Sequence, residues 1–207
     1  MRIQIKFAAA LLLFILAGCD GLNGKVEKPA ALKDDFTKGY LLSDSEVEEG
    51  YFTFKSKTDG YTMLFPQDAV ISDDFGNEIH GLEYEAILYG AKRDGAAIET
   101  QITYEDNRST SKLEPNLSLL SSSIGYEGSY KEMKEDGKVH YFAKDVMDVG
   151  KATAYSYLSF IKADTTNQAV RIVYTITCQK KDTSCTAKQN DFEQVAIKMV
   201  KSIVFKK

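Results

Sequence analysis

The sequence predicts an α+β fold in which an antiparallel β-sheet of about six to seven strands is covered by two helices. From Tyr51 onwards, apolar and polar residues alternate in several segments separated by short turn sequences, a pattern typical of hairpins. Two other segments carry apolar residues three or four positions apart, as in amphipathic helices. The length of 207 residues and a hydrophobic content of 43% fit one globular domain.

Two hairpins are expected first. In the segment 52–55, Phe52 and Phe54 alternate with polar residues; "TDG" supplies a turn, and alternation resumes from Tyr61 to Pro66. The second hairpin pairs 82–88 with 98–104 across "KRDG".

A helix is predicted over residues 113–124, where leucines recur at helical spacing, Pro115 lies near the first turn and Gly125 ends the pattern. Strand patterns then return over 130–134, 139–147, 152–162 and 168–178, with turn sequences between them. This spacing predicts a four-stranded meander. An apolar face from Phe192 to Ile203 predicts a C-terminal helix, and residues 203–205 are expected to pack along a sheet edge.

The order of these elements resembles the PsbP/Mog1 family, whose members include a photosystem oxygen-evolving subunit and a Ran-binding protein. The resemblance rests on "SKTDGYTMLFPQDA" near the start of the domain and "NDFEQVAIKMVKSIVF" at its end, and it covers residues 50–207. It implies an α/β/α sandwich. Because most members of the family are non-catalytic accessory or binding proteins, it also implies that this chain is not an enzyme.

The first eighteen residues have the pattern of a secretory signal peptide. Arg2 and Lys6 flank an apolar run that is too short to span a bilayer as a helix. The following "LAGC" resembles the lipobox of bacterial lipoproteins, in which the cysteine is acylated with fatty acids such as palmitate and becomes the mature N-terminus. The resemblance identifies Cys19 as the lipidation site and places the protein at the cell membrane, outside the cytoplasm. An ordinary signal peptide with an incidental cysteine is the alternative.

Residues 19–49 are predicted to form a flexible, lipid-anchored tether, with a short helix near 30–36. They are rich in charged and small residues and carry no sustained period. Such a tether would reach about 30 Å. Asp20, directly after the cysteine, resembles an inner-membrane retention signal of Gram-negative bacteria and would carry no meaning in a Gram-positive cell.

The formal charge of −4 argues against nucleic-acid binding, which needs a basic surface to neutralise phosphates. Removal of residues 1–18 would make the charge about −6. The same balance argues against a polybasic membrane patch.

Cys178 and Cys185 bracket a short polar segment between the last meander strand and the C-terminal helix. Outside the cytoplasm, a disulfide is the natural use of two thiols this close in sequence. A redox role is the weaker alternative because the pair lacks CxxC spacing.

No catalytic, metal or cofactor site is predicted. Asp73, Asp74, Asn77, Glu78 and His80 form a local cluster of potential metal ligands, but the cluster lacks calcium-loop and zinc-protease spacing and is interpreted as a solvated loop. The "DFG" within it lacks the other kinase motifs. The serines of "LSLLSSSIG" are expected on the exposed side of a helix, with no GxSxG sequence. A pair of carboxylates for glycoside cleavage stays open.

Four meander tyrosines, Tyr141, Tyr155, Tyr157 and Tyr174, could form a binding face or could be ordinary sheet packing. The leading hypothesis is a membrane-anchored, non-catalytic accessory lipoprotein that binds another protein of the bacterial envelope. The alternative is a lipoprotein that binds a small ligand or glycan through the tyrosines. An envelope hydrolase is the third hypothesis.

Overall fold

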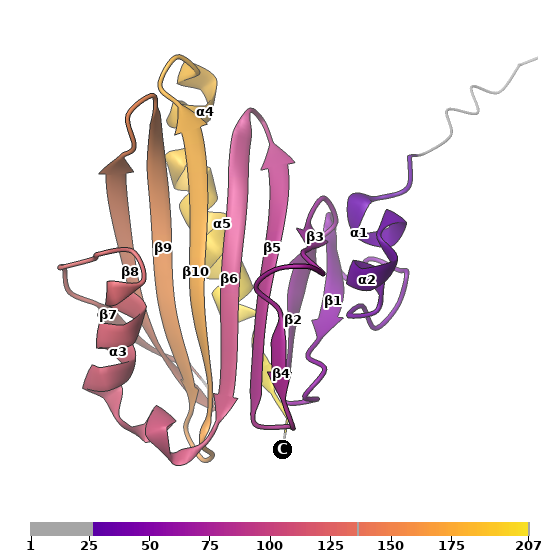
Figure 1. Cartoon of the computed structure of the whole chain (residues 1–207), viewed down its shortest axis with the longest axis vertical. Coiled ribbons are helices and arrows are strands. Elements are labelled where there is room, and N and C mark those ends of the chain that lie inside the picture. Colours follow the sequence, from indigo (N-terminus) through magenta and orange to yellow (C-terminus); the bar gives the residue numbers. More distant parts are fainter. Residues whose placement is uncertain (1–26, 136, 207) are drawn as a thin grey trace, which may run out of the picture.

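The computed structural model describes residues 27–135 and 137–206, which form two antiparallel sheets and the helices packed on them (Figure 1). The large sheet has the strand order β3-β5-β6-β10-β9-β8-β7, and β4 pairs with β5 beside β3. The small sheet has the order β1-β2-β11. The fold is therefore α+β, as the sequence predicts.

The large sheet contains the second predicted hairpin and the whole predicted meander. Its strands are β3 (Val70–Ile71), β4 (Glu78–His80), β5 (Tyr84–Arg93), β6 (Ala96–Asp106), β7 (Lys131–Glu135), β8 (Lys138–Asp148), β9 (Ala152–Ala163) and β10 (Gln168–Gln179). Strand β10 lies between β9 and β6, so the meander and the hairpin form one continuous sheet.

The first predicted hairpin lies outside the large sheet, which corrects the expectation of one sheet. Strands β1 (Tyr51–Lys55) and β2 (Tyr61–Pro66) pair with each other, and the C-terminal β11 (Val204–Phe205) adds to β2. Their aromatic side chains pack against the large sheet: Phe65 lies 5.0 Å from Tyr89 and Tyr61 lies 5.3 Å from Tyr104, between ring centroids. Alternation alone could not distinguish the two arrangements, because each of them buries one side of the hairpin.

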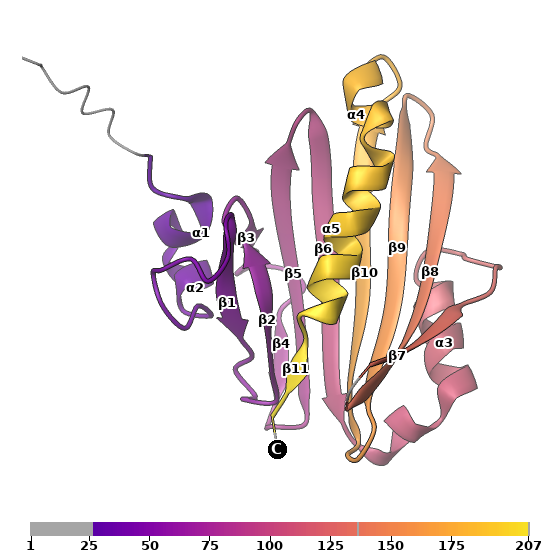
Figure 2. The ribbon, with the colours of Figure 1, turned by 180° about the vertical axis from the view of Figure 1, so that it is seen from behind.

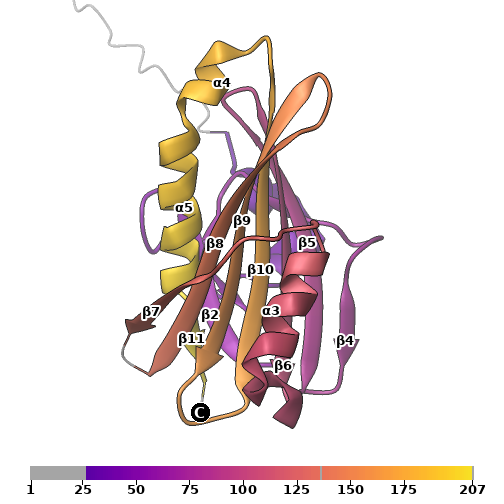
Figure 3. The ribbon, with the colours of Figure 1, turned by 90° about the vertical axis from the view of Figure 1, so that its left-hand side faces the viewer.

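Two helices cover opposite faces of the large sheet, as the sandwich prediction requires (Figures 2 and 3). Helix α5 (Gln189–Lys201), preceded by the short α4 (Thr183–Ala187), crosses one face together with the small sheet. We call this the inner face. Helix α3 (Leu113–Ser122), preceded by the 3₁₀ turn η1 (Arg108–Ser111), lies on the opposite, outer face.

The predicted tether is wrong for residues 30–49, because this segment is folded onto the small sheet. Helices α1 (Ala30–Lys33) and α2 (Asp35–Lys38) occupy the region of the expected short helix. The side chains of Ala31 and Tyr40 are buried in the main core, and the Tyr40 ring stacks on Phe54 at 5.4 Å. The few apolar side chains of this charged segment attach it to the domain, although their positions in the sequence show no regular period.

Candidate functional site

In the described part of the chain, the outer face is covered by α3 alone, whereas the inner face is covered by α5 and the small sheet. Helix α3 buries Leu120 against a second, smaller core on β8, β9 and β10. Among the described residues, no helix lies above the outer surface of β5 and β6 (Figure 1). The candidate site is therefore built around α3.

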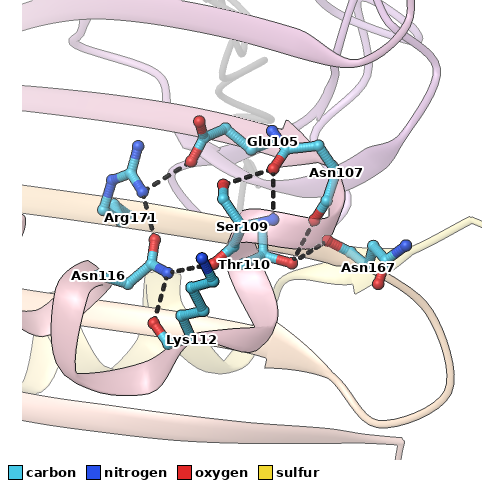
Figure 4. Close-up of polar contacts among 8 residues, drawn as sticks. All are labelled: Glu105, Asn107, Ser109, Thr110, Lys112, Asn116, Asn167 and Arg171. Carbon is cyan, nitrogen blue, oxygen red and sulfur yellow. Dashed lines mark hydrogen bonds and ion pairs between the residues drawn. The ribbon is translucent and has the colours of Figure 1, made fainter.

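A network of hydrogen bonds fixes the N-terminal end of α3 to the sheet (Figure 4). Arg171 on β10 places Nη1 2.7 Å from Glu105 Oε2 on β6 and donates to Asn116 Oδ1, also at 2.7 Å. Asn116 in turn donates to the carbonyl oxygens of Ser109 and Lys112 at 3.0 and 2.8 Å. Arg171 and Asn116 are largely buried, so the network sets the position of α3 rather than binding a ligand.

Thr110 completes this attachment from the 3₁₀ turn. Its hydroxyl donates to the carbonyl oxygens of Asn107 and Asn167 at 2.9 and 2.5 Å, and the residue is fully buried. Asn167 lies between β9 and β10, so the turn before α3 is tied to the far end of the meander. Sequence reasoning gave no role to any residue of this network, since its members lie up to 66 positions apart.

A cavity of about 530 Å³ lies on one side of α3, between the helix, the connection after it and strands β7 and β8. We call it the tyrosine groove and define it by Tyr126, Tyr130, Tyr141, Glu114, Glu127 and Glu132. The Tyr126 and Tyr130 rings stand nearly perpendicular, at 81°, with centroids 5.6 Å apart.

Hydrogen bonds hold the hydroxyls of Tyr126 and Tyr130 in place. Tyr130 Oη lies 2.9 Å from Ser121 Oγ on α3, and Tyr126 Oη donates to the Ser129 carbonyl oxygen at 2.8 Å. Burial and then the charge of Asp145 raise the pKa of Tyr126, and burial and then Glu132 raise the pKa of Tyr141. The phenols therefore stay neutral, and the carboxylates carry the charge of the groove.

On the other side of α3, two adjoining cavities of about 260 and 320 Å³ share Gln101 and Thr103 as floor residues. We call this recess the sheet trough; it runs from Leu119 on α3 to Phe75 in the segment between β3 and β4. Phe75 is 75% exposed and Leu119 is 56% exposed. Gly76 has φ +75°, and a Cβ there would lie 2.6 Å from Leu88 Cβ, so only glycine lets this segment lie so close to the outer face.

The acidic segment beside Phe75 is exposed at Asp73, Asp74, Glu78 and His80, as expected for a solvated segment, although Glu78 and His80 belong to the short strand β4 and not to a loop. Asn77 is only partly exposed. His80 contacts Glu78 and the Tyr84 ring, with its Nε2 2.5 Å from Glu78 Oε1. Within the described part of the chain, no three His, Cys, Asp or Glu side chains are grouped so that they could hold a metal ion.

Three of the four meander tyrosines belong to the inner core. Tyr155, Tyr157 and Tyr174 are buried beneath α5, and Tyr157 Oη donates to the Gln189 carbonyl oxygen at 3.0 Å. Of the two interpretations left open by the sequence, ordinary sheet packing is therefore correct for these three tyrosines, and they form no binding face; only Tyr141 lies on the outer face, in the tyrosine groove.

His140 is fully buried on the inner side of β8, 3.5 Å from Glu135. Burial lowers its pKa to about 4, so the ring is neutral near pH 7. Next to it, Lys138 Nζ donates to the carbonyl oxygens of Lys201 and Ile203 at 2.7 and 2.5 Å. This cluster attaches the end of α5 to the sheet.

The cysteine pair predicted from the sequence is a disulfide in the structure, with a Cα–Cα distance of 5.7 Å between Cys178 and Cys185. Both residues are fully buried, and the bond joins β10 to α4. In the chain-entropy account, a loop of this length contributes about 2 to 3 kcal/mol to stability.

Cys19, the predicted lipidation site, lies outside the described residues. No helix among residues 27–135 and 137–206 has the length and hydropathy needed to cross a membrane. The serines at the end of α3 are mostly exposed, and Ser122 and Ser123 donate to carbonyl oxygens of their own helix.

The sheets and the helices packed on them define a class, an α+β domain, and the family model that the chain matches groups it with Mog1-like domains. Within that class, the chain belongs to the family described as "Putative lipoprotein YvcA", whose family model matches residues 27–204. It is 27% identical over 185 residues to "Putative lipoprotein YvcA" of Bacillus subtilis (strain 168), an alignment that covers 84% of this chain and 76% of that protein.

Two solved structures of Mog1 are also similar in outline. The Ran-binding protein Mog1p of Saccharomyces cerevisiae is 11% identical, with a TM-score of 0.47 and coverage of 74% of this chain and 94% of that one. A point mutant of protein Mog1 is 13% identical, with a TM-score of 0.48 and coverage of 74% and 95%.

The tyrosine groove is the part of the site that sequence reasoning missed. Its residues follow α3 in the segment "YEGSYKE" (126–132), which mixes aromatic and acidic side chains. That mixture is the signal that could have drawn attention to it, because neither a regular strand nor a tight turn requires it.

Proposed function

We propose that this chain is a lipoprotein anchored through Cys19 on the outer side of the cell membrane, where it binds another envelope protein as a non-catalytic accessory. Membership of the lipoprotein family and the "LAGC" sequence support the anchor. The observation that carries the binding role is the open sheet trough, flanked at its two ends by the exposed side chains of Phe75 and Leu119. Exposed apolar side chains beside a recess are typical of protein-binding surfaces.

The folded start of the domain supports a position of this surface close to the membrane. Residue 31 is already attached, since its backbone nitrogen donates to the Gln67 carbonyl oxygen at 3.0 Å. The segment from Cys19 to Pro29 can span at most about 36 Å when fully extended. An acylated Cys19 therefore keeps the domain within roughly its own length of the bilayer, and the partner is expected to be a membrane or membrane-proximal protein.

The placement of the histidines and serines supports a non-catalytic role. His140 is buried on the inner face, away from both recesses, and His80 is engaged with Glu78. Ser122 and Ser123 donate to carbonyl groups of their own helix, and Ser121 contacts a tyrosine hydroxyl. None of these arrangements has a base beside a nucleophile, which serine hydrolysis requires.

The test is site-specific photocrosslinking in the native cells. A photoreactive amino acid is placed at Leu119, at Phe75 or, as a matched control, at Leu42, which is 56% exposed like Leu119 but lies between α2 and β1. We expect one reproducible protein adduct from Leu119 and Phe75, absent from Leu42, and lost when Cys19→Ser releases the chain from the membrane. Adducts of equal yield from all three positions, or none from any, would contradict the proposal.

A further inference from the structure

We propose that the tyrosine groove binds the side chain of a lysine or arginine in a basic, extended segment of the partner protein. This inference rests on the proposed function and names the chemistry of one contact on the same outer face. It starts from the groove's shape: a cavity of about 530 Å³ is larger than one side chain needs and fits a short stretch of chain.

The aromatic walls favour a cation. Tyr126 and Tyr130 stand at 81° with centroids 5.6 Å apart, so they form a corner rather than a flat platform. A sugar ring stacks best on a flat aromatic face, whereas an ammonium or guanidinium group can contact two faces at a corner. The faces of aromatic rings carry partial negative charge and attract cations within about 6 Å.

The charges around the corner have the matching sign. Glu114, Glu127 and Glu132 line the groove and are exposed, and Asp145 lies close enough to contribute to the raised pKa of Tyr126. Glu132 pairs with Lys134 at 3.3 Å, but both side chains are largely exposed, and such pairs exchange readily. Among the described residues, neither Glu114 nor Glu127 lies within 4.0 Å of a basic side chain. An anionic ligand would be repelled.

The groove is also preorganised. Ser121 on α3 holds the Tyr130 hydroxyl, and the Ser129 carbonyl holds that of Tyr126. Helix α3 is itself fixed to the sheet by Arg171 and Asn116. Binding therefore needs little ordering of side chains, which favours affinity.

The experiment titrates the isotope-labelled mature chain carrying Cys19→Ser with an acetylated, amidated peptide of alternating lysine and glycine, followed by NMR. The same peptide with every lysine acetylated is the neutral control. We expect saturable shifts of backbone amides at 113–132 and 141 with the basic peptide and none with the neutral one. Shifts scattered over the surface, or equal binding of both peptides, would overturn the inference.

Matched variants distinguish binding of the peptide at the groove from attraction of the peptide by the net negative charge of the chain. Glu127→Gln together with Glu132→Gln should weaken binding about tenfold, whereas Asp73→Asn with Asp74→Asn removes the same charge elsewhere and should leave it within about twofold. Tyr126→Leu should weaken binding more than Tyr126→Phe, because only the latter keeps an aromatic face. Equal losses in both charge pairs would show that the net charge alone binds the peptide.

Two further ligands test other occupants. Titration with phosphatidylethanolamine vesicles or with chitooligosaccharide should leave the groove amides unshifted, and saturable shifts with either in place of the peptide would overturn the inference. Because photocrosslinking at Leu119 does not depend on these titrations, failure of the groove to bind a cation leaves the proposed protein-binding function separately testable.

Discussion

The two faces of the large sheet are built from the same strands but carry different side chains. On the inner face, aromatic and branched residues form one continuous core with α5 and the small sheet. On the outer face, the core is limited to the area under α3, and polar side chains such as Gln101 and Thr103 form the floor of an open recess. We therefore expect the inner face to contribute most of the stability, and the proposed binding function assigns the open part of the outer face to the partner.

The largest loss of stability is expected when a side chain of the inner core is truncated at Phe54. Its ring is fully buried and stacks with Tyr40 and Phe65, so it joins the N-terminal segment to the small sheet. Phe54→Ala should lower the free energy of unfolding by about 3 to 5 kcal/mol, measured by urea denaturation. A loss below about 1 kcal/mol would show that the N-terminal segment does not pack on the domain.

The polar connections on the outer face should matter less, because a hydrogen bond contributes less net free energy than the burial of an aromatic ring. Arg171→Met removes a partner from Glu105 and from Asn116 and should cost about 1.5 to 3 kcal/mol. Compared with the native chain, this variant should show faster hydrogen exchange in α3, with a smaller change in β10. Arg108→Met, an exposed arginine in the neighbouring turn, is the matched control and should change neither. Uniformly faster exchange across the sheet would show that the network supports the whole fold instead of the helix.

The stability of the fold should also depend on pH through His140, which lies on the inner face. Its pKa is lowered to about 4 in the folded protein, below about 6.5 when unfolded. Between these values the unfolded chain binds more protons, so this contribution to stability is present above about pH 6.5 and is lost as the pH falls towards 4.

His140→Leu should therefore be less sensitive to acid than the native chain, by about 1 to 2 kcal/mol in the difference between pH 7.5 and pH 5. Unfolding by urea at both pH values measures this. The exposed His80→Leu serves as the control, and an identical pH dependence of native chain and His140→Leu would refute the assignment.

Residues of the two faces show which features of the structure could be predicted from the sequence and which could not. Alternation located the strands of the meander, and apolar residues three or four positions apart located the helices on either side of the sheet, because burial of one face imposes a period on nearby residues. Phe54 was recognised as a strand residue, but its contact with Tyr40 was not, since the tether region has no period. Cys178 and Cys185 are close in sequence and were predictable as a pair. Arg171, Glu105 and Asn116 are far apart in sequence and were not predictable, because the contact of Arg171 with Glu105 depends on the register of β6 and β10 and that with Asn116 on the packing of α3.

The smallest effect on stability, and the sharpest test of the comparison, is expected at Phe75. It is the same residue type as Phe54 but is 75% exposed at the rim of the sheet trough. Phe75→Ala should therefore change the free energy of unfolding by less than about 0.5 kcal/mol. It should nevertheless reduce the yield of the adduct captured from Leu119 severalfold, because the partner would lose an apolar contact at the other end of the same recess. A stable variant with unchanged capture would remove Phe75 from the binding surface, whereas a large loss of stability would show that the outer face supports the fold as the inner face does.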